Sequence, residues 1–439
     1  MTVTKTTTDV TIPGPTLEDF EDAKRVLEGV AQTTPMEYSR YLEEVLGVPV
    51  YLKCENLQRT GAYKIRGAYY CISKLTDEQK AKGVVAASAG NHAQGVAFAA
   101  KEQGIKATIF TPVGVALPKL QATKAYGADV VLGGNDMLEP FAKAKEFSEK
   151  TGAVRIPPFD HPDIVAGQGT VGLEILEQQP DVRTVIVPIG GGGLIAGVAS
   201  AMKQQAAKLG HSIRVIGVQA ENAAPYPQSL KEGHPIEIQV KPTISDGIAV
   251  GKPGALNFDI IKETVDEVVT VSDDETARAI LVLLERAKMV VEPSGATPVA
   301  AILAGKIKAE GPTAVVLSGG NIDPMIMERV ISRGLAGAGR YLKMRIPLPD
   351  RPGQLAITSR IVSDNNANVV EVLHTRHGTG LQISQVELEL HIETRGPEHA
   401  EQVLSALRSE GYEPRTEFWG IKVSTSIIST AISAPLGAV

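Results

Sequence analysis

Four consecutive glycines, Gly190, Gly191, Gly192 and Gly193, stand before Leu194 and join a β-branched run to a helical pattern. Glycine lets the backbone turn its N–H groups toward an anion, and the positive end of the following helix adds to the attraction. A tight turn needs one or two glycines, so four predict a phosphate-binding loop. The spacing also loosely fits G-x-G-x-x-A, which keeps a dinucleotide open, although the acid that such a site needs would be the late-lying Glu221.

Lys64 lies in the segment TGAYKIRGA at 60–68, among small and apolar residues. A lysine in an apolar pocket has a lowered pKa, which a Schiff-base lysine requires. Taken alone, the stretch fits a solvated lysine better, because lysines are mostly exposed.

A third cluster, Ser88, Ala89, Gly90, Asn91 and His92, ends an apolar strand and opens a helix. Exposed N–H groups at a helix N-terminus suit a carboxylate. The alternatives are a helix capped by Asn91 and a His92 that only packs.

The elements that must position these clusters alternate along the chain. Apolar runs at 84–88, 107–112, 129–133, 184–190, 214–221 and 313–320 are separated by helical patterns, among them 93–103, 119–126, 138–150 and one ending at Lys208. Such alternation predicts an α/β fold with parallel sheets covered on both faces. Ligands bind at the carboxyl ends of such strands, and the clusters follow those ends.

The pattern changes after about residue 335, where Gly334, Gly337 and Gly339 suggest a linker at 336–343. We expect strands at 341–349, 368–376, 385–393 and 413–420, with helices at 354–365 and 398–410. The order βαββαβ is the ferredoxin-like arrangement. This part carries no evident nucleophile or base, which predicts a binding module, and 420–439 is interpreted as a tail.

The bulk properties exclude several classes of partner. A chain of 439 residues with a net charge of −6 allows two or three domains and disfavours nucleic acid or an anionic membrane. We see no signal peptide and no bilayer-spanning stretch. Two cysteines, Cys54 and Cys71, do not make a disulfide framework, so we expect a reducing compartment, the cytoplasm.

Together the clusters resemble the fold-type II pyridoxal-phosphate enzymes, the family of threonine and serine dehydratases and serine racemases. The resemblance covers about residues 16–335 and is strongest to the threonine dehydratases, also called threonine ammonia-lyases. It rests on AYKIRGA at 62–68, SAGNHAQG at 88–95, GGGGL at 190–194 and SGGN at 318–321, with Ala62 where many members have serine. Residues 344–419, with their Asp-Arg-Pro-Gly turn, resemble an ACT domain, a small-molecule sensor.

The resemblance implies a role for each cluster, with two parallel-sheet subdomains around pyridoxal 5'-phosphate. Lys64 would hold the cofactor aldehyde, the segment Gly190–Leu194 its phosphate, Asn91 its ring oxygen and Ser318 its pyridine nitrogen. Substrate would meet Ser88, Ala89, Gly90, Asn91 and His92. An effector would meet the turn formed by Asp350, Arg351, Pro352 and Gly353.

The implied activity is dehydration and deamination of L-threonine to 2-oxobutanoate and ammonia. A serine dehydratase and a serine racemase are the alternatives within the family. Ala89 stands where racemases have serine, and Gln219 and Pro225 stand near their metal-binding acids, so we predict no metal. An NAD-dependent dehydrogenase and an amino-acid sensor are the alternatives from other classes.

The ACT resemblance implies allosteric regulation and a homo-oligomer, which we expect to be a tetramer. The effector would be isoleucine, valine or a nucleotide. Isoleucine biosynthesis and threonine breakdown therefore both remain open as the pathway.

Overall fold

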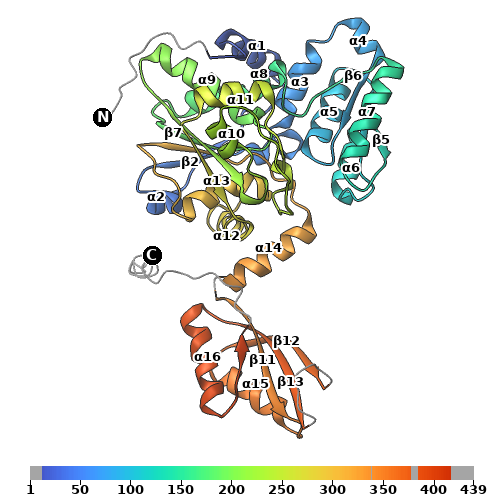
Figure 1. The fold of residues 1–439 in the computed structure, drawn as a ribbon. Helices are drawn as coiled ribbons and strands as arrows, with labels where there is room; N and C mark the ends of the chain where they lie inside the picture. Colours follow the sequence, from blue (N-terminus) through green and yellow to red (C-terminus); the bar gives the residue numbers. More distant parts are fainter. Residues whose placement is uncertain (1–11, 338, 377–383, 417–439) are drawn as a thin grey trace. The chain divides into compact units, whose positions relative to one another are not determined.

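The computed structural model describes residues 12–337, 339–376 and 384–416, which contacts divide into two compact units between Met327 and Glu328 (Figure 1). The division lies inside helix α14 (Pro324–Gly337). We had expected a boundary at 335 and a linker at 336–343. Instead, Gly334 and Gly337 belong to this helix, because an isolated glycine weakens a helix without ending it.

The larger sheet of the first unit has the strand order β1-β2-β10-β7-β8-β9. Only the pairing of β1 with β2 is antiparallel, and the remaining pairs are parallel. Its inner strands are buried β-branched runs, as expected for strands covered on both faces. The strands are β1 (Met36–Tyr38), β2 (Val50–Lys53), β7 (Thr184–Pro188), β8 (Arg214–Ala220), β9 (Glu267–Val271) and β10 (Thr313–Val316).

The smaller sheet has the order β5-β4-β3-β6 and is parallel throughout. Its strands are β3 (Val84–Ala87), β4 (Ala107–Thr111), β5 (Asp129–Leu132) and β6 (Val154–Arg155). In Figure 1 these strands form a separate group with α4–α7, drawn in blue to green. The expected α/β fold with two parallel-sheet subdomains is confirmed.

Helices join the strands and cover the sheets, and several begin at side-chain caps. Thr16 and Asp19 form a capping box at α1, and Ser272 and Glu275 form one at α12. The helices of the first unit are α1 (Leu17–Leu27), α2 (Arg40–Leu46), α3 (Lys64–Ser73), α4 (Asp77–Lys82), α5 (Asn91–Glu102), α6 (Leu117–Ala125), α7 (Leu138–Thr151), α8 (Pro162–Gln178), α9 (Gly193–Leu209), α10 (Tyr226–Glu232), α11 (Ala255–Thr264), α12 (Asp273–Val282) and α13 (Pro293–Leu303). Short 3₁₀ turns lie at Glu55–Leu57, Arg59–Gly61, Glu221–Ala223 and Asp246–Ile248, and a π-helical segment at Leu283–Ala287.

The second unit is a four-stranded antiparallel sheet with the order β12-β13-β11-β14. Leu342, Met344, Ile346 and Leu348 alternate with wetter positions along β11 and are buried in one core with the matching residues of β13. The sequence order βαββαβ and this strand order are those of a ferredoxin-like fold, as expected. Its elements are β11 (Tyr341–Pro349), α15 (Gln354–Asp364), β12 (Asn368–Thr375), β13 (Gln385–Glu393), α16 (Pro397–Ser409) and β14 (Arg415–Thr416).

Two predictions fall at the end of the chain. The rest of the expected last strand, 417–420, and the tail at 420–439 lie outside the described residues. Within the described residues, no helix combines the length and the apolar character needed to cross a membrane.

Candidate active site

Two loops that lie far apart in the sequence of the first unit pair with each other and bring Lys64 close to Ser318. Ala62 forms a bridge with Gly319, and the Tyr63 N–H donates to the Ser318 carbonyl at 3.2 Å. The Gly320 N–H donates to the Gly61 carbonyl at 2.8 Å. Lys64 follows directly as the first residue of α3, so strand β10 and helix α3 together place the lysine near Ser318.

The amine of Lys64 contacts a backbone carbonyl and an aromatic ring. Its Nζ donates to the Pro158 carbonyl at 2.8 Å and lies 5.3 Å from the centre of the Tyr63 ring. Burial lowers the pKa of Lys64 to about 8, against the opposing charge of Glu292. Near neutral pH a useful fraction of this amine is therefore uncharged and able to act as a nucleophile or a base.

The four glycines between β7 and α9 form a loop that admits no side chain. A Cβ at Gly191 would lie 2.5 Å from the Phe159 ring, and one at Gly192 would lie 2.1 Å from Tyr226 Oη. Gly192 also has a φ of +100°. Asn257 Nδ2 donates to the Gly191 carbonyl at 3.0 Å, which turns that carbonyl toward the protein. Among the hydrogen bonds of the described residues, none uses the N–H groups of Gly191, Gly192 or Gly193, which leaves them for an anion.

The Ser88–His92 segment lies at the carboxyl end of β3, and α5 begins there at Asn91, two residues earlier than expected. Gly90 is the N-cap and no side chain caps the helix, so the N-terminal amides stay available for a carboxylate. The Ser88 hydroxyl accepts the Gly90 N–H at 3.2 Å. Ala89 lies between these two residues in the loop.

Two of the expected site residues have buried side chains that are engaged elsewhere. His92 Nε2 lies 2.9 Å from the Ile156 carbonyl, and burial, helped by the charge of Lys64, lowers its pKa to about 3. A neutral, buried His92 supports α5, and only its backbone N–H remains for a substrate. Leu194 packs into the core beside the large sheet, so it also can reach a ligand only through its backbone.

Glu292, at the N-cap of α13, is a site residue that we did not predict. Its Oε1 accepts a hydrogen bond from Asn91 Nδ2 at 2.8 Å. Burial and the charge of Asp246 raise the pKa of Glu292 to about 7, although Lys119, Asn91 and Lys64 act against this. The one available signal in the sequence was a single acid between the apolar run Met289–Val291 and a helix-starting proline.

Asn321 ends the SGGN motif at 318–321, and its side chain contacts the site directly, a role that we did not predict. Its Nδ2 donates to Asn91 Oδ1 at 2.9 Å and to the Thr60 carbonyl at 2.7 Å. Nearby, Lys119 of α6 pairs with Asp246 at 2.9 Å, which links the smaller-sheet half of the unit to the larger-sheet half.

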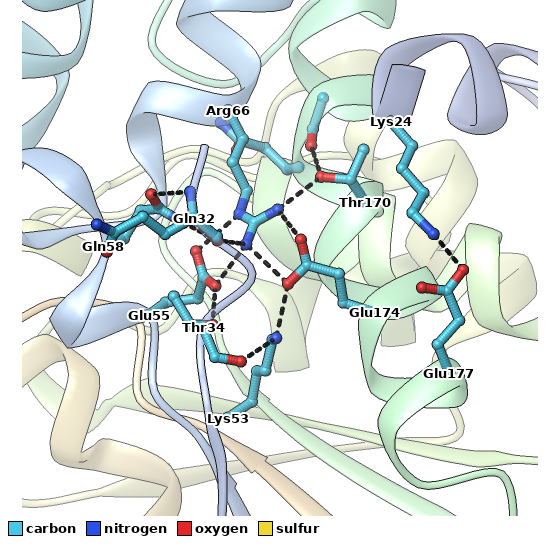
Figure 2. A network of polar contacts seen from close by, with 12 residues as sticks. Lys24, Gln32, Thr34, Lys53, Glu55, Gln58, Arg66, Thr170, Glu174 and Glu177 are labelled. Atoms are coloured by element: carbon cyan, nitrogen blue, oxygen red, sulfur yellow. Dashed lines mark hydrogen bonds and ion pairs between the residues drawn. The ribbon is translucent and has the colours of Figure 1, made fainter. Parts of the chain in front are cut away.

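A buried ion cluster forms around Arg66, which belongs to the helix that begins at Lys64 (Figure 2). Arg66 donates to Glu55 from Nε and Nη2, both at 2.8 Å, and to Glu174 from Nη1 at 2.6 Å. Lys53 Nζ reaches the other oxygen of Glu174 at 2.6 Å. All four side chains are buried, so each charge depends on its partners.

One group of described residues gathers potential metal ligands, namely Cys71, His161 and Asp163. His161 Nδ1 already accepts the Asp163 N–H at 3.2 Å as the cap of α8. Burial raises the pKa of the Cys71 thiol to about 12. Gln219, near the position of the racemase metal-binding acids, accepts the Tyr226 N–H at 3.0 Å.

Comparison with known proteins points the same way as this geometry. Residues 27–319 match the family described as pyridoxal-phosphate dependent enzyme. Over 401 residues the chain is 47% identical to the L-threonine ammonia-lyase of Thermotoga maritima, covering 91% of this chain and 99% of that protein. This alignment is longer than the first unit, so it reaches into the second.

Solved structures resemble the first part of the chain. Maize serine racemase has a TM-score of 0.68 at 36% identity, over 73% of this chain and 98% of its own. Threonine deaminase isoform 2 of Solanum lycopersicum has a TM-score of 0.67 at 38% identity, over 73% of this chain and 95% of its own. In both comparisons the match covers nearly the whole of the related chain but only about three quarters of this one.

Proposed function

The chain belongs to the pyridoxal-phosphate-dependent enzymes, and on that premise we propose that it converts L-threonine into 2-oxobutanoate and ammonia. The observation that carries the proposal is Lys64, an amine of lowered pKa, beside a glycine loop with unused N–H groups. The similarity to an enzyme named L-threonine ammonia-lyase supports the substrate.

The residues present fit the cofactor. Phe159 and Tyr226 pack against the Gly190–Gly193 loop too closely for a Cβ, and the N–H groups of Gly191, Gly192 and Gly193 have no partner among the described hydrogen bonds, so they would hold phosphate oxygens. Lys64 supplies the amine that an aldehyde requires, and Ser318 brings a hydroxyl group rather than a carboxylate for the ring nitrogen. Pyridoxal phosphate, when bound, supplies a ring that spreads the negative charge formed at the substrate Cα.

The chain's own groups would then divide the work. The N-terminal amides of α5, with Ser88, would hold the substrate carboxylate and fix the Cα bond to be broken. The neutral amine of Lys64 would take the Cα proton, a step in which a positioned base contributes roughly 10²–10⁴-fold. The β-hydroxyl group leaves as water, and hydrolysis of the released product gives the 2-oxoacid and ammonia.

The rival within the family is a serine racemase, which the fold also resembles. Racemisation needs a second proton carrier on the opposite face of the ring, and Ala89 has no group that can carry a proton. We therefore propose that L-serine is dehydrated rather than racemised. Formation of D-serine from L-serine at a rate matching 2-oxoacid formation would overturn this choice.

The experiment that tests the function is the visible spectrum of the purified protein, with 2-oxoacid formation assayed from L-threonine and L-serine. We expect a visible cofactor band, 2-oxobutanoate from threonine, and a kcat/KM for threonine above that for serine. One methyl group in a pocket is worth about 10–200-fold at most. A preference for serine would refute the substrate. A colourless protein that stays inert with added pyridoxal phosphate would leave the dehydrogenase and the sensor as the alternatives.

We propose further that the second unit regulates the first by binding an amino acid or a nucleotide at the turn Asp350–Gly353. Gly353 has a φ of +91° and caps α15 without a side-chain bond, so a small ligand can approach the backbone there. Arg376 lies 3.5 Å from Asp350 and brings a second charge to the turn.

Removing the residues beyond about 340 is expected to leave 2-oxobutanoate formation intact and to abolish any response to isoleucine, valine or nucleotide. Solved structures that resemble 73% of this chain are covered over 95–98% of their own length, which suits a catalytic part that folds without the remainder. Initial rates with and without each effector measure the response. A truncated, folded enzyme that still responded would show that the sensor lies elsewhere.

We also propose a cytoplasmic homotetramer. The edge strand β12 exposes Val370, Val372 and Leu373, an apolar edge of the kind that subunit contacts cover. Both cysteines of the described chain are free and buried, which suits a reducing compartment. Light scattering of the purified protein measures the mass, and a monomer at micromolar concentration would refute the assembly.

A further inference from the structure

The carboxamide of Asn91 is held by a partner at each end. Asn321 Nδ2 donates to Asn91 Oδ1 at 2.9 Å, and Asn91 Nδ2 donates to Glu292 Oε1 at 2.8 Å. The last acceptor in this series of hydrogen bonds is the Thr60 carbonyl. A carbonyl can only accept, and this one accepts a hydrogen bond from Asn321 Nδ2 at 2.7 Å. The Thr60 carbonyl therefore fixes which end of the Asn321 amide is nitrogen. The same nitrogen faces Asn91, so the Asn91 oxygen accepts from Asn321 and the Asn91 nitrogen donates to Glu292.

Glycines make room for both partners of Asn91. A Cβ at Gly61 would lie 2.3 Å from Asn321 Oδ1, and one at Gly319 would lie 2.4 Å from Glu292 Oε1. These two glycines belong to the paired loops that bring Lys64 to Ser318. Any larger residue at either position would displace a partner of Asn91.

These hydrogen bonds also connect the smaller-sheet half of the first unit to its larger-sheet half. Asn91 begins α5 after β3 of the smaller sheet, whereas Asn321 follows β10 of the larger sheet. Glu292 precedes α13 and its N–H donates to the Gly319 carbonyl at 2.9 Å. Among the described hydrogen bonds, Asn91 Nδ2 has Glu292 as its one acceptor, so a second N–H of the same amide remains available.

We infer that Asn321 and Glu292 are positioning residues that orient the Asn91 carboxamide, so that its remaining N–H is presented to the ring oxygen of the cofactor. The inference rests on the proposed function, because it needs pyridoxal phosphate to bind beside Lys64. Without Asn321, the amide of Asn91 can rotate by half a turn and present its oxygen to the ring oxygen, where two acceptors repel. Where Glu292 is ionised, its charge strengthens the same orientation, since an ionised acceptor makes the stronger bond.

The test is a double-mutant cycle on cofactor affinity. The apoenzyme of the wild type, Asn91→Ala, Asn321→Ala and the double variant is titrated with pyridoxal phosphate, and the dissociation constant is read from the visible band. We expect each single variant to bind about tenfold more weakly, the upper value for one hydrogen bond. We expect the double variant to bind no more weakly than Asn91→Ala, because Asn321 acts through Asn91. Equal losses that add in the double variant would overturn the inference.

A second pair of variants keeps the test decisive if Asn321→Ala fails to fold by circular dichroism. Glu292→Gln keeps an oxygen for Asn91 and should retain most of the affinity for pyridoxal phosphate. Glu292→Ala removes that oxygen, so it should bind the cofactor more weakly and shift the absorption maximum of the bound cofactor. An Ala variant that matched the Gln variant in both readouts would contradict the proposal. Asn222→Ala, which removes one exposed bond to the Pro242 carbonyl, is the matched control and should match the wild type.

The outcomes separate this inference from the proposed function. A wild-type protein that binds no pyridoxal phosphate refutes the function and the inference together. A wild-type protein that binds it, with additive losses in the cycle, refutes the inference alone.

Discussion

Replacing Lys64 with alanine is expected to abolish 2-oxobutanoate formation, with a loss of at least about 10⁴-fold. A positioned base alone contributes about 10²–10⁴-fold, and Lys64 is also the amine that would hold the cofactor aldehyde. The variant should lose the visible band of the wild type as well. The measurement is the initial rate from L-threonine together with the absorption spectrum.

The reactivity of Lys64 should also depend on pH, in a direction that its pKa sets. The pKa of Lys64 is lowered to about 8, so the neutral, reactive amine increases as pH rises through that value. The rate at which apoenzyme captures pyridoxal phosphate should therefore rise between about pH 7 and 9. Lys106→Ala, which removes an exposed lysine paired with Asp129, is the matched control and should leave rate and spectrum unchanged. Full activity in Lys64→Ala would refute the assignment.

Replacing Arg66 with methionine should reduce the free energy of unfolding by about 3–5 kcal/mol, the typical cost of removing one partner from a buried ion pair. Glu55 would lose its main counter-ion, and Glu174 would keep only Lys53. Although burial raises the pKa of Glu55, the nearby charges of Arg66 and Lys53 more than offset it, so Glu55 is ionised in the fold.

Urea unfolding followed by circular dichroism measures this loss. Arg40→Met provides the matched control, because Arg40 pairs with Glu44 on an exposed helix face where a pair is worth about 0.3–0.5 kcal/mol. A loss for Arg66→Met as small as that of the control would show that the cluster does not stabilise the fold.

Local patterns were enough to predict six strands of the parallel sheets and the alternating strands of the second unit. Strands β3, β4, β5, β7, β8 and β10 lie in the predicted apolar runs, and period two is clear in Val386–Ile392. Strands β1, β2, β6 and β9 were not predicted. The linker at 336–343 stays a prediction, but α14 extends through its first two positions. Gly334 and Gly337 are breakers by residue type, but their neighbours in α14 continue the helical pattern.

The site could be predicted only where one segment carries its own chemistry. The four glycines are recognisable from their neighbours alone, whereas Lys64 became a candidate only together with the other motifs. Asn91 also looked like a helix cap, but it bonds instead to Glu292 and Asn321, which lie 201 and 230 positions away along the chain. No local pattern reports such contacts, so Glu292 and the part played by Asn321 emerged only from the fold.

The order of strands in the larger sheet also determines when the protein can become active during its synthesis. Strand β10 lies between β2 and β7, and its partners in β2 precede it by about 260 residues. The smaller sheet uses only a continuous stretch from Val84 to Arg155, so it can form while the rest is still being translated. We expect β2 to stay unpaired on the side that β10 covers, and exposed to solvent there, until β10 has left the ribosome. Since β10 also delivers Ser318 to Lys64, a nascent chain stopped before that strand would carry the lysine without an active site.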